Sequence, residues 1–255
     1  MFLFQCNDKN ILYTGDFRIS DFEAYSQLKD LALDKIYLDS TFLSPKFNYF
    51  PTQEESVSKI CELSKRFLDK DDSNRVVILM PAKWCWLDFP FLITIYEYFN
   101  QPILVTNDVF QRYKSLEDIV VDEQQILTKD NINDDVKIIL EYKGIRPTEL
   151  SEQQFLGQRE RELRKKYGKD LKIIIPSAFR WRNLKKDEEI VNGKHVACSF
   201  HCSFSELRNF VHHFDPEQIF LNVLTYDIID FLKSKDLDPN NLSRENWNQL
   251  FNNNK

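Results

Sequence analysis

Residues 52–80, TQEESVSKICELSKRFLDKDDSNRVVILM, hold a predicted helix and the strand that follows it. Thr52 and Glu55 have the spacing of a capping box, which marks a helix start. Apolar residues then recur with helical spacing, at Val57, Ile60, Leu63, Phe67 and Leu68. The run RVVILM at 75–80 is apolar at successive positions, which predicts a strand covered on both faces of a sheet. A helix that leads into such a strand is typical of an α/β fold.

The same alternation continues in both directions along the chain. Strands are expected at 1–5, 11–13, 35–38, 102–106, 173–175, 196–200 and 219–224. Helices are expected at 89–99, 151–167, 203–214 and 228–232. The first two strands flank the polar turn 7–10 and form a hairpin, and Ser151 with Gln154 makes a second capping box. The sequence therefore predicts an α/β protein with mixed sheets.

Composition narrows the class of protein. The chain has 255 residues, of which 42% are apolar and 29% charged, so it has too many core-forming residues for a disordered protein. This length suits one large domain or two interlocked ones. The five glycines show neither the G-x-G-x-x-G nor the G-x-x-x-x-G-K spacing, which excludes these nucleotide-binding loops. No apolar run approaches the roughly 18 residues that cross a bilayer, so no membrane segment is expected.

The cysteines predict the redox environment. They are five in number and scattered, at 6, 61, 85, 198 and 202. The N-terminus also lacks the basic region of a secretory signal. Together these features predict reduced thiols in an intracellular protein.

Three strings place polar groups directly after apolar strands: ILYTGDFR at 11–18, IYLDSTF at 36–42 and ACSFHCSFSE at 197–206. Carboxylates and an imidazole at strand ends suit a metal site, and the serines after His201 could cap a helix whose N–H groups bind phosphate. The alternative is structural, because an Asp after a strand is commonly a turn former or helix cap. Cys198 and Cys202 are too irregularly spaced for a zinc site and suit a buried strand.

Basic residues are concentrated in one segment. Residues 143–186, here called the basic segment, contain 13 Lys and Arg against five Asp and Glu, while the rest of the chain carries a net charge of −14. With Tyr167, Phe179 and Trp181 among them, these residues could follow a phosphate backbone and stack on bases. They could equally form a solvated helix face, because opposite charges recur at i,i+3 and i,i+4.

In this order, TGDFR at 14–18, YLDSTF at 37–42 and SFHCSFSEL at 199–207 resemble the DNA-repair branch of the metallo-β-lactamase/β-CASP nuclease family. MFLFQ at 1–5, FPTQEE at 50–55 and FLNV at 220–223 extend the resemblance over nearly the whole chain. It implies a partial metallo-β-lactamase αββα sandwich with an inserted β-CASP α/β domain.

The resemblance also implies a domain organisation. Residues 1–45 would end the first metallo-β-lactamase segment, and 46–169 would form the β-CASP domain. Residues 170–226 would be the returning metallo-β-lactamase segment, and 227–255 a helical, partly frayed tail.

By the same resemblance, Asp16, Asp39 and His201 are the catalytic residues. Asp16 corresponds to the ligand that bridges two metal ions, His201 completes the second metal position, and Asp39 supports the site. The implied cofactor is a divalent metal, zinc, with magnesium or manganese as alternatives for turnover. Such ions polarise the scissile phosphate and generate hydroxide from water. The residues expected to bind nucleic acid are Ser199, Ser203, Ser205, Lys172, Arg180 and Lys83.

One departure from the family pattern limits the expected activity. The H-x-H-x-D-H ligand motif is absent, since all four histidines lie at 195–213. Asp16, Asp39 and His201 alone cannot complete two metal sites, so this chain by itself is expected to have little or no nuclease activity. The simplest explanation is that the first half of the lactamase-like domain is missing before Met1. Apolar sheet edges exposed by that loss predict poor solubility.

The implied function is a phosphodiester hydrolase in the nucleus. It would act as a 5′-exonuclease and structure-specific endonuclease on DNA ends or damaged DNA, in double-strand-break end joining and interstrand-crosslink repair. DNA-dependent protein kinase would be a partner of the full-length protein. The main alternative is a non-catalytic DNA-binding or regulatory module, and an RNA-processing nuclease is a less favoured one.

Overall fold

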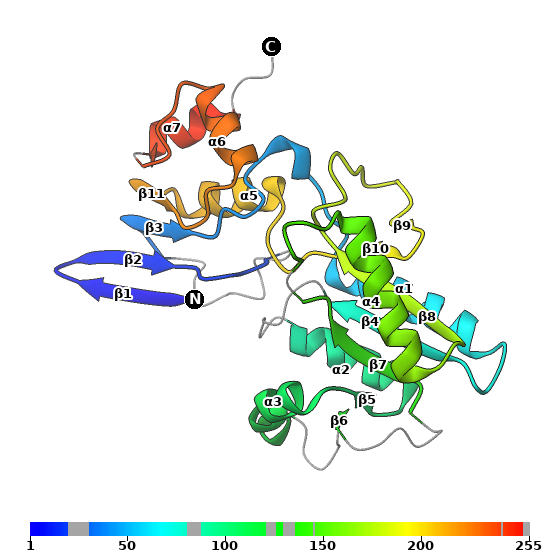
Figure 1. Ribbon diagram of the computed structural model, residues 1–255. Coiled ribbons are helices and arrows are strands. Elements are labelled where there is room, and N and C mark those ends of the chain that lie inside the picture. Colours follow the sequence, from blue (N-terminus) through cyan, green and yellow to red (C-terminus); the bar gives the residue numbers. More distant parts are fainter. Residues whose placement is uncertain are drawn as a thin grey trace. The chain divides into compact units, whose positions relative to one another are not determined.

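The computed structural model describes residues 1–19, 31–80, 88–120, 126–129, 136–144, 146–240 and 242–251, without the side chains of 88–89 and 115–120. The chain divides into two compact units (Figure 1). Unit 1 comprises Met1–Phe50, Trp181–Glu188 and Ser199–Lys255. Unit 2 comprises Pro51–Arg180 and Glu189–Cys198.

Unit 1 contains a five-stranded sheet in the order β1-β2-β3-β11-β12. Its strands are β1 (Phe2–Cys6), β2 (Lys9–Tyr13), β3 (Lys35–Leu38), β11 (Gln218–Leu221) and β12 (Leu242–Ser243). The hairpin β1–β2 is antiparallel, whereas β3 runs parallel to both β2 and β11. Because β2 and β3 are parallel, the residues that follow Tyr13 and Leu38 emerge at the same edge of the sheet.

One face of this sheet packs against helices. These are α5 (Phe204–Phe214), α6 (Tyr226–Lys233) and α7 (Arg244–Phe251), preceded in the chain by the short 3-10 helix η2 (Pro45–Phe47). Leu12, Ile36 and Ile219 belong to one buried cluster with residues of α5, α6 and α7. Alternate residues such as Tyr13 and Tyr37 are exposed, as expected for a sheet with one covered face.

Unit 2 contains a seven-stranded sheet in the order β6-β5-β7-β4-β8-β10-β9. Its strands are β4 (Arg75–Met80), β5 (Ile103–Leu104), β6 (Leu127–Thr128), β7 (Ile138–Tyr142), β8 (Leu171–Ser177), β9 (Val191–Asn192) and β10 (His195–Ala197). All neighbouring pairs are parallel except β9–β10. The central strand β4 is buried from Val76 to Met80, which confirms the predicted doubly covered strand.

The helices of unit 2 are α1 (Gln53–Leu68), α2 (Asp88–Phe99), α3 (Asn107–Val120) and α4 (Glu152–Tyr167). Both predicted capping boxes are present, Thr52 with Glu55 and Ser151 with Gln154. Gly168 ends α4 with a φ of 102°, a conformation that glycine adopts without strain. Among the described helices, none combines the length and the apolar character that a bilayer crossing requires.

The predicted α/β class with mixed sheets is confirmed, and several boundaries are corrected. The strand predicted at 196–200 ends at Ala197, because the chain turns after it to lead into α5. The strand predicted at 102–106 is reduced to Ile103–Leu104. α3 and β7 were not predicted, and β7 carries a buried glutamate, Glu141, inside its apolar run.

The predicted domain assignment stays a prediction. In the structure, β8 and β10 belong to the sheet of unit 2, whereas Ser199–Lys255 belongs to unit 1, so both units contain parts of the predicted segment 170–226. The predicted tail contains α6 and α7, and Trp247 and Leu250 of α7 are buried. Four cysteines, Cys6, Cys61, Cys198 and Cys202, are described and are thiols, while Cys85 lies outside the described residues.

Candidate metal centre

Asp16, Asp39 and His201 come together at the carboxyl edge of the unit 1 sheet. Asp16 follows β2 through Gly15, whose φ of +58° lets the backbone turn, and Asp39 follows β3 directly. His201 lies in the loop before α5. One potential ligand atom from each residue lies within 4.8 Å of the others. Two carboxylates and an imidazole form a donor set that suits a divalent cation.

Asp39 is buried, and both of its carboxylate oxygens are engaged. Oδ1 accepts hydrogen bonds from the backbone N–H and hydroxyl of Thr41, at 3.1 and 2.6 Å. Oδ2 lies 2.7 Å from His201 Nδ1. Burial alone raises the pKa of Asp39, but the hydrogen bond and charge of His201 and the hydrogen bonds of Thr41 outweigh it, so that the pKa is lowered. Asp39 is therefore ionised at neutral pH.

The contact with Asp39 determines which nitrogen of His201 is available. An ionised carboxylate only accepts hydrogen bonds, so Nδ1 must carry the proton in the bond to Asp39. In a neutral imidazole the lone pair is then on Nε2, the nitrogen with the electron pair that a metal ligand needs. Asp39 thus has the geometry of a residue that orients His201. The exposed Asp16 supplies the accessible carboxylate.

Arg18, which the sequence analysis did not single out, joins the first motif to the third. Its side chain is 3% exposed, and it donates hydrogen bonds to the Glu206 carboxylate at 3.1 Å and to the Ser199 carbonyl at 2.9 Å. Glu206 also accepts from the backbone N–H of Ser203, the N-cap of α5. This network therefore links the loop that carries Asp16 to the loop that carries His201. The sequence signal for a buried arginine was its position between two apolar residues, Phe17 and Ile19, which are both buried in the structure.

Cys202 has a structural role beside this network. Its backbone N–H donates to the Phe17 carbonyl at 3.0 Å, and its Sγ accepts from the Ile19 N–H at 3.4 Å. Burial raises the pKa of the Cys202 thiol, so it stays protonated. These contacts agree with the structural interpretation of this cysteine.

Comparison with known proteins shows what the chain is similar to. Residues 122–226 match the family described as DNA repair metallo-beta-lactamase. The chain is 28% identical to the protein artemis of Mus musculus over an alignment of 255 residues. This alignment covers 91% of the chain and 34% of the mouse protein. The chain is thus similar to the Artemis-like DNA-repair metallo-β-lactamases over most of its length. The resemblance inferred from the motifs is confirmed.

Two shorter alignments are to a second artemis protein and to a DNA cross-link repair protein. The protein artemis of Pongo abelii is 40% identical over 78 residues, which is 28% of the chain and 11% of that protein. The DNA cross-link repair protein pso2/snm1 of Schizosaccharomyces pombe is 32% identical over 84 residues, which is 31% of the chain and 15% of that protein. The chain spans no more than about a third of the length of these relatives.

The three serines that the family resemblance assigned to phosphate binding all form contacts within unit 1. The Ser199 hydroxyl donates to the His201 carbonyl at 2.7 Å, and Ser203 caps α5 by accepting from the Glu206 N–H. Both residues are 1% exposed. Ser205 is only partly buried, and its hydroxyl donates to the Asn48 carbonyl at 2.7 Å. Phosphate binding by these serines stays a prediction.

The basic residues predicted to bind nucleic acid lie in other parts of the chain than the metal centre. Lys172 and Arg180 belong to unit 2, and Lys83 lies outside the described residues. Lys172 Nζ donates to the Leu63 carbonyl at 3.1 Å, and burial followed by the nearby Lys70 and Arg66 lowers its pKa. Arg180 lies 3.5 Å from Glu152. Their predicted role is likewise untested.

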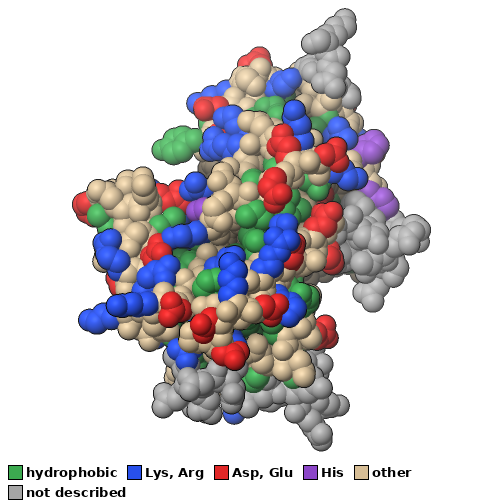
Figure 2. All heavy atoms as spheres, turned by 90° about the vertical axis from the view of Figure 1, so that its right-hand side faces the viewer, with side chains coloured by type: hydrophobic (Ala, Val, Ile, Leu, Met, Phe, Trp, Pro, Cys, Tyr) green, Lys and Arg blue, Asp and Glu red, His purple; other side chains and the backbone are tan. Residues whose placement is uncertain are grey.

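The basic segment is extensively ion-paired. Arg159, Arg164 and Lys166 contact Glu141, Glu160 or Glu162. On the face shown in Figure 2, Lys and Arg side chains are interspersed with Asp and Glu. Tyr167 is buried and donates to Glu141 at 2.6 Å, so it is not available to stack on a base, whereas Phe179 is exposed.

Proposed function

We propose that Asp16, Asp39 and His201 form part of a divalent-metal centre that hydrolyses DNA phosphodiesters during DNA repair. The observation that carries this proposal is the convergence of three potential ligand atoms within 4.8 Å from three separate segments. The relatives support the substrate class, because their names identify DNA repair proteins. The divalent ion proposed is zinc, with magnesium or manganese as the alternatives for turnover.

Each residue has a distinct part in this proposal. Asp16 and His201 Nε2 would hold the ion, and Asp39 would keep His201 in the tautomer that leaves Nε2 unprotonated. A bound divalent ion polarises a phosphoryl oxygen and lowers the pKa of a coordinated water. Arg18 and Glu206 hold the two loops together without contacting the ligand atoms themselves. Ser205, the least buried of the three serines, is the proposed phosphate contact at the start of α5, where its hydroxyl would exchange its bond to the Asn48 carbonyl for one to a phosphate oxygen.

The finer biological setting is proposed from the family resemblance of the sequence motifs. The substrates would be DNA ends or damaged DNA, cut by 5′-exonuclease and structure-specific endonuclease activity. The pathways would be double-strand-break end joining and interstrand-crosslink repair, in the nucleus. DNA-dependent protein kinase would be a partner of the full-length protein.

A second candidate is a non-catalytic DNA-binding module, and the ligand count favours it for the chain alone. The sequence contains no H-x-H-x-D-H motif, and the described cluster supplies two proposed ligands, Asp16 and His201, with Asp39 orienting the imidazole. Two ligands completed by water can hold one ion, whereas a two-metal mechanism needs a second set. We therefore propose that the isolated chain binds one divalent ion and has little or no nuclease activity.

Metal titration followed by a cleavage assay tests both candidates. Zinc and manganese would be titrated by calorimetry into the purified 255-residue chain and into Asp16→Asn and His201→Ala. Asp230→Asn is the matched control, because Asp230 is an exposed carboxylate on α6 in the same unit. We expect one ion per chain, bound at least about 10-fold more weakly by the two site variants and normally by the control. Absence of metal binding would leave only the DNA-binding module.

Cleavage of 5′-labelled duplex DNA with a single-stranded overhang then separates the activities. Little or no cleavage by the wild-type chain is expected. Strong cleavage that His201→Ala abolishes would overturn the proposed inactivity and establish the nuclease. DNA binding without cleavage, measured by fluorescence anisotropy at stated salt, would support the module.

A further inference from the structure

A cavity of about 620 Å³ lies in unit 2, among α4, β8 and the β9–β10 turn. Its apolar lining comes from two neighbouring strands and a helix: Leu79 of β4, Ile173 and Ile175 of β8, and Leu156 of α4. Polar side chains line the rest, among them His195 and Arg180. This combination of an apolar floor and a few convergent polar groups is typical of small-molecule sites.

The charges around the cavity leave an excess of cations. Glu152 contacts Lys143 at 3.0 Å and Arg180 at 3.5 Å. Glu160 contacts Arg164 at 2.9 Å and also pairs with Lys194. Two carboxylates are thus shared by four cations, of which Arg180 and Lys194 line the cavity. The local field therefore favours a ligand that carries negative charge.

Gly157 lines the cavity from the middle of α4, where glycine is unfavourable. Its φ lies outside the left-handed region, so the backbone conformation does not require glycine. A Cβ atom added at this position would come no closer than 3.8 Å to another atom, at the end of the Arg161 side chain. Neither strain nor packing explains this glycine. Close approach of a flat ligand to the helix backbone does explain it.

His195 adds a hydrogen-bonding group that stays uncharged. Its ring is buried on β10, and Nδ1 lies 3.4 Å from the Ser177 hydroxyl. Burial, followed by the charge of Arg180, lowers the pKa of His195 to about 4. A neutral imidazole can both donate and accept a hydrogen bond, as the edge of a heterocyclic base requires.

We propose that this cavity is a nucleotide-binding site. The base would lie against Gly157, Leu156 and the Ile173–Ile175 floor, with His195 at its polar edge. The phosphate would lie toward Arg180 and Lys194. None of these residues belongs to the metal centre. A test of nucleotide binding here is therefore independent of whether the metal centre is a nuclease. The nucleotide could be a free mononucleotide or the 5′-phosphorylated end of a DNA strand, since both present the same chemistry.

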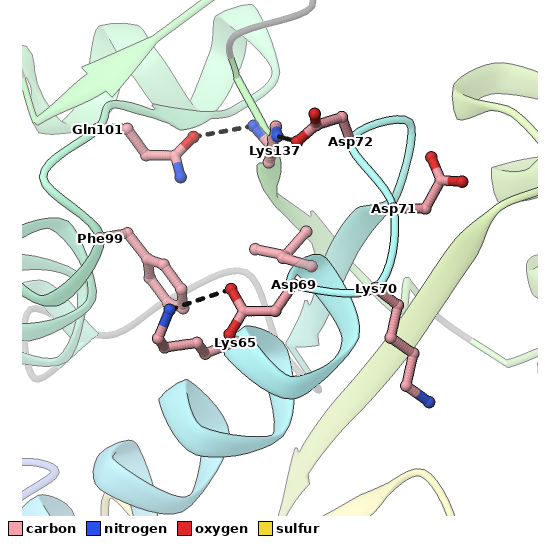
Figure 3. Close-up of a pocket in the computed structure, with 9 residues that line it drawn as sticks. Lys65, Asp69, Lys70, Asp71, Asp72, Phe99, Gln101 and Lys137 are labelled. Carbon is pink, nitrogen blue, oxygen red and sulfur yellow. Dashed lines mark hydrogen bonds and ion pairs between the residues drawn. The ribbon is translucent and has the colours of Figure 1, made fainter.

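A second hollow in unit 2 lacks these features. It has a volume of about 640 Å³ and is lined by Lys65, Asp69 and Lys137 among others. Lys65 pairs with Asp69 and Lys137 with Asp72, at 3.0 and 3.2 Å (Figure 3). Its lining among the described residues contains no histidine, and its apolar residues are Leu68 and Phe99, so it lacks both the imidazole and the apolar strand floor of the α4 cavity. The nucleotide proposal is therefore specific to the cavity at α4.

The test is calorimetric titration of the full chain with adenosine 5′-monophosphate, adenosine and inorganic phosphate. Adenosine 5′-monophosphate should bind, and adenosine and inorganic phosphate should each bind at least about 10-fold more weakly. Gly157→Leu would fill the cavity from a helical position and should reduce nucleotide affinity by at least about 10-fold. Gln158→Leu is the matched control, because Gln158 is the exposed next residue of α4 and does not line the cavity. Its affinity should be unchanged.

Several outcomes would overturn the proposal. They are no binding of adenosine 5′-monophosphate, equal binding of inorganic phosphate, and equal affinity in Gly157→Leu and wild type. Circular dichroism and the melting temperature of Gly157→Leu show whether the variant is folded, and Arg180→Gln provides an independent reading of the phosphate end. A 5′-phosphorylated tetranucleotide, compared with its unphosphorylated form, distinguishes the two sources. If the phosphorylated tetranucleotide competes with adenosine 5′-monophosphate and the unphosphorylated form does not, the ligand of the cavity is a 5′-phosphorylated DNA end.

Discussion

His201 Nδ1 lies 2.7 Å from Asp39 Oδ2, although 162 residues separate them in the sequence. The contact joins the loop after β3 to the loop before α5, and it fixes the protonation of the imidazole. A carboxylate that orients a histidine in this way commonly tunes a metal site. The metal affinity of His201 should therefore depend on Asp39 even if Asp39 does not touch the ion.

Asp39→Asn should weaken zinc binding by about 10- to 100-fold, because an amide holds the imidazole N–H less strongly than a carboxylate does. Calorimetry measures the affinity, and Asp230→Asn again controls for loss of one carboxylate. Because Asp39 is buried, the melting temperature of the variant must be compared as well. An unchanged zinc affinity in a folded Asp39→Asn protein would show that Asp39 does not orient His201.

Arg18→Met should destabilise unit 1 by about 3–5 kcal/mol, because it leaves the Glu206 carboxylate without its buried partner. Arg18→Lys should be intermediate, since lysine keeps the charge but not the planar set of donors. Urea unfolding measures both. The matched control is Arg182→Met, which breaks the more exposed pair with Asp227 and should cost less than about 1 kcal/mol. Equal losses at Arg18 and Arg182 would contradict this account.

Glu141→Gln should destabilise unit 2 by about 3 kcal/mol. Glu141 is buried and contacts Arg159 at 2.9 Å, Lys166 at 2.8 Å and the Tyr167 hydroxyl at 2.6 Å. Glu162→Gln is a close control, because Glu162 contacts the same Arg159 but is half exposed. Its effect on the free energy of unfolding should stay below about 1 kcal/mol. A loss at Glu162 as large as at Glu141 would show that burial does not set the difference.

His195 should remain neutral down to about pH 4, the value to which burial and then Arg180 lower its pKa. In the unfolded chain its pKa returns to about 6.5, so the unfolded state takes up a proton first. Its contribution to stability is thus full above about pH 6.5 and is lost as the pH falls toward 4. Histidine ring shifts measured by NMR in the wild type and His195→Gln check the titration. A ring that titrates near pH 6.5 in the folded protein would contradict the buried, cation-facing environment.

Local sequence signals were sufficient for many elements of the fold. The capping boxes at Thr52 and Ser151 form as predicted because each needs only residues within one helical turn. The run 75–80 becomes the buried strand β4 because only a strand inside a sheet covers both of its faces. The convergence of Asp16 and Asp39, in contrast, depends on the parallel pairing of β2 with β3, which brings the residues after both strands to the same edge of the sheet.

The contacts that define the two sites required the tertiary structure. The sequence determined the helices, most strands and, through its motifs, the three residues of the metal centre, because periodicity and capping depend on near neighbours. Only the packing decided that Arg18 reaches Glu206, that Glu141 is buried inside β7, and that Ser199 and Ser203 turn inward. It also brought Gly157 and His195 to one cavity. The partner of a buried charge is whichever opposite charge the folded elements bring within a few ångströms, and that partner can lie anywhere along the chain.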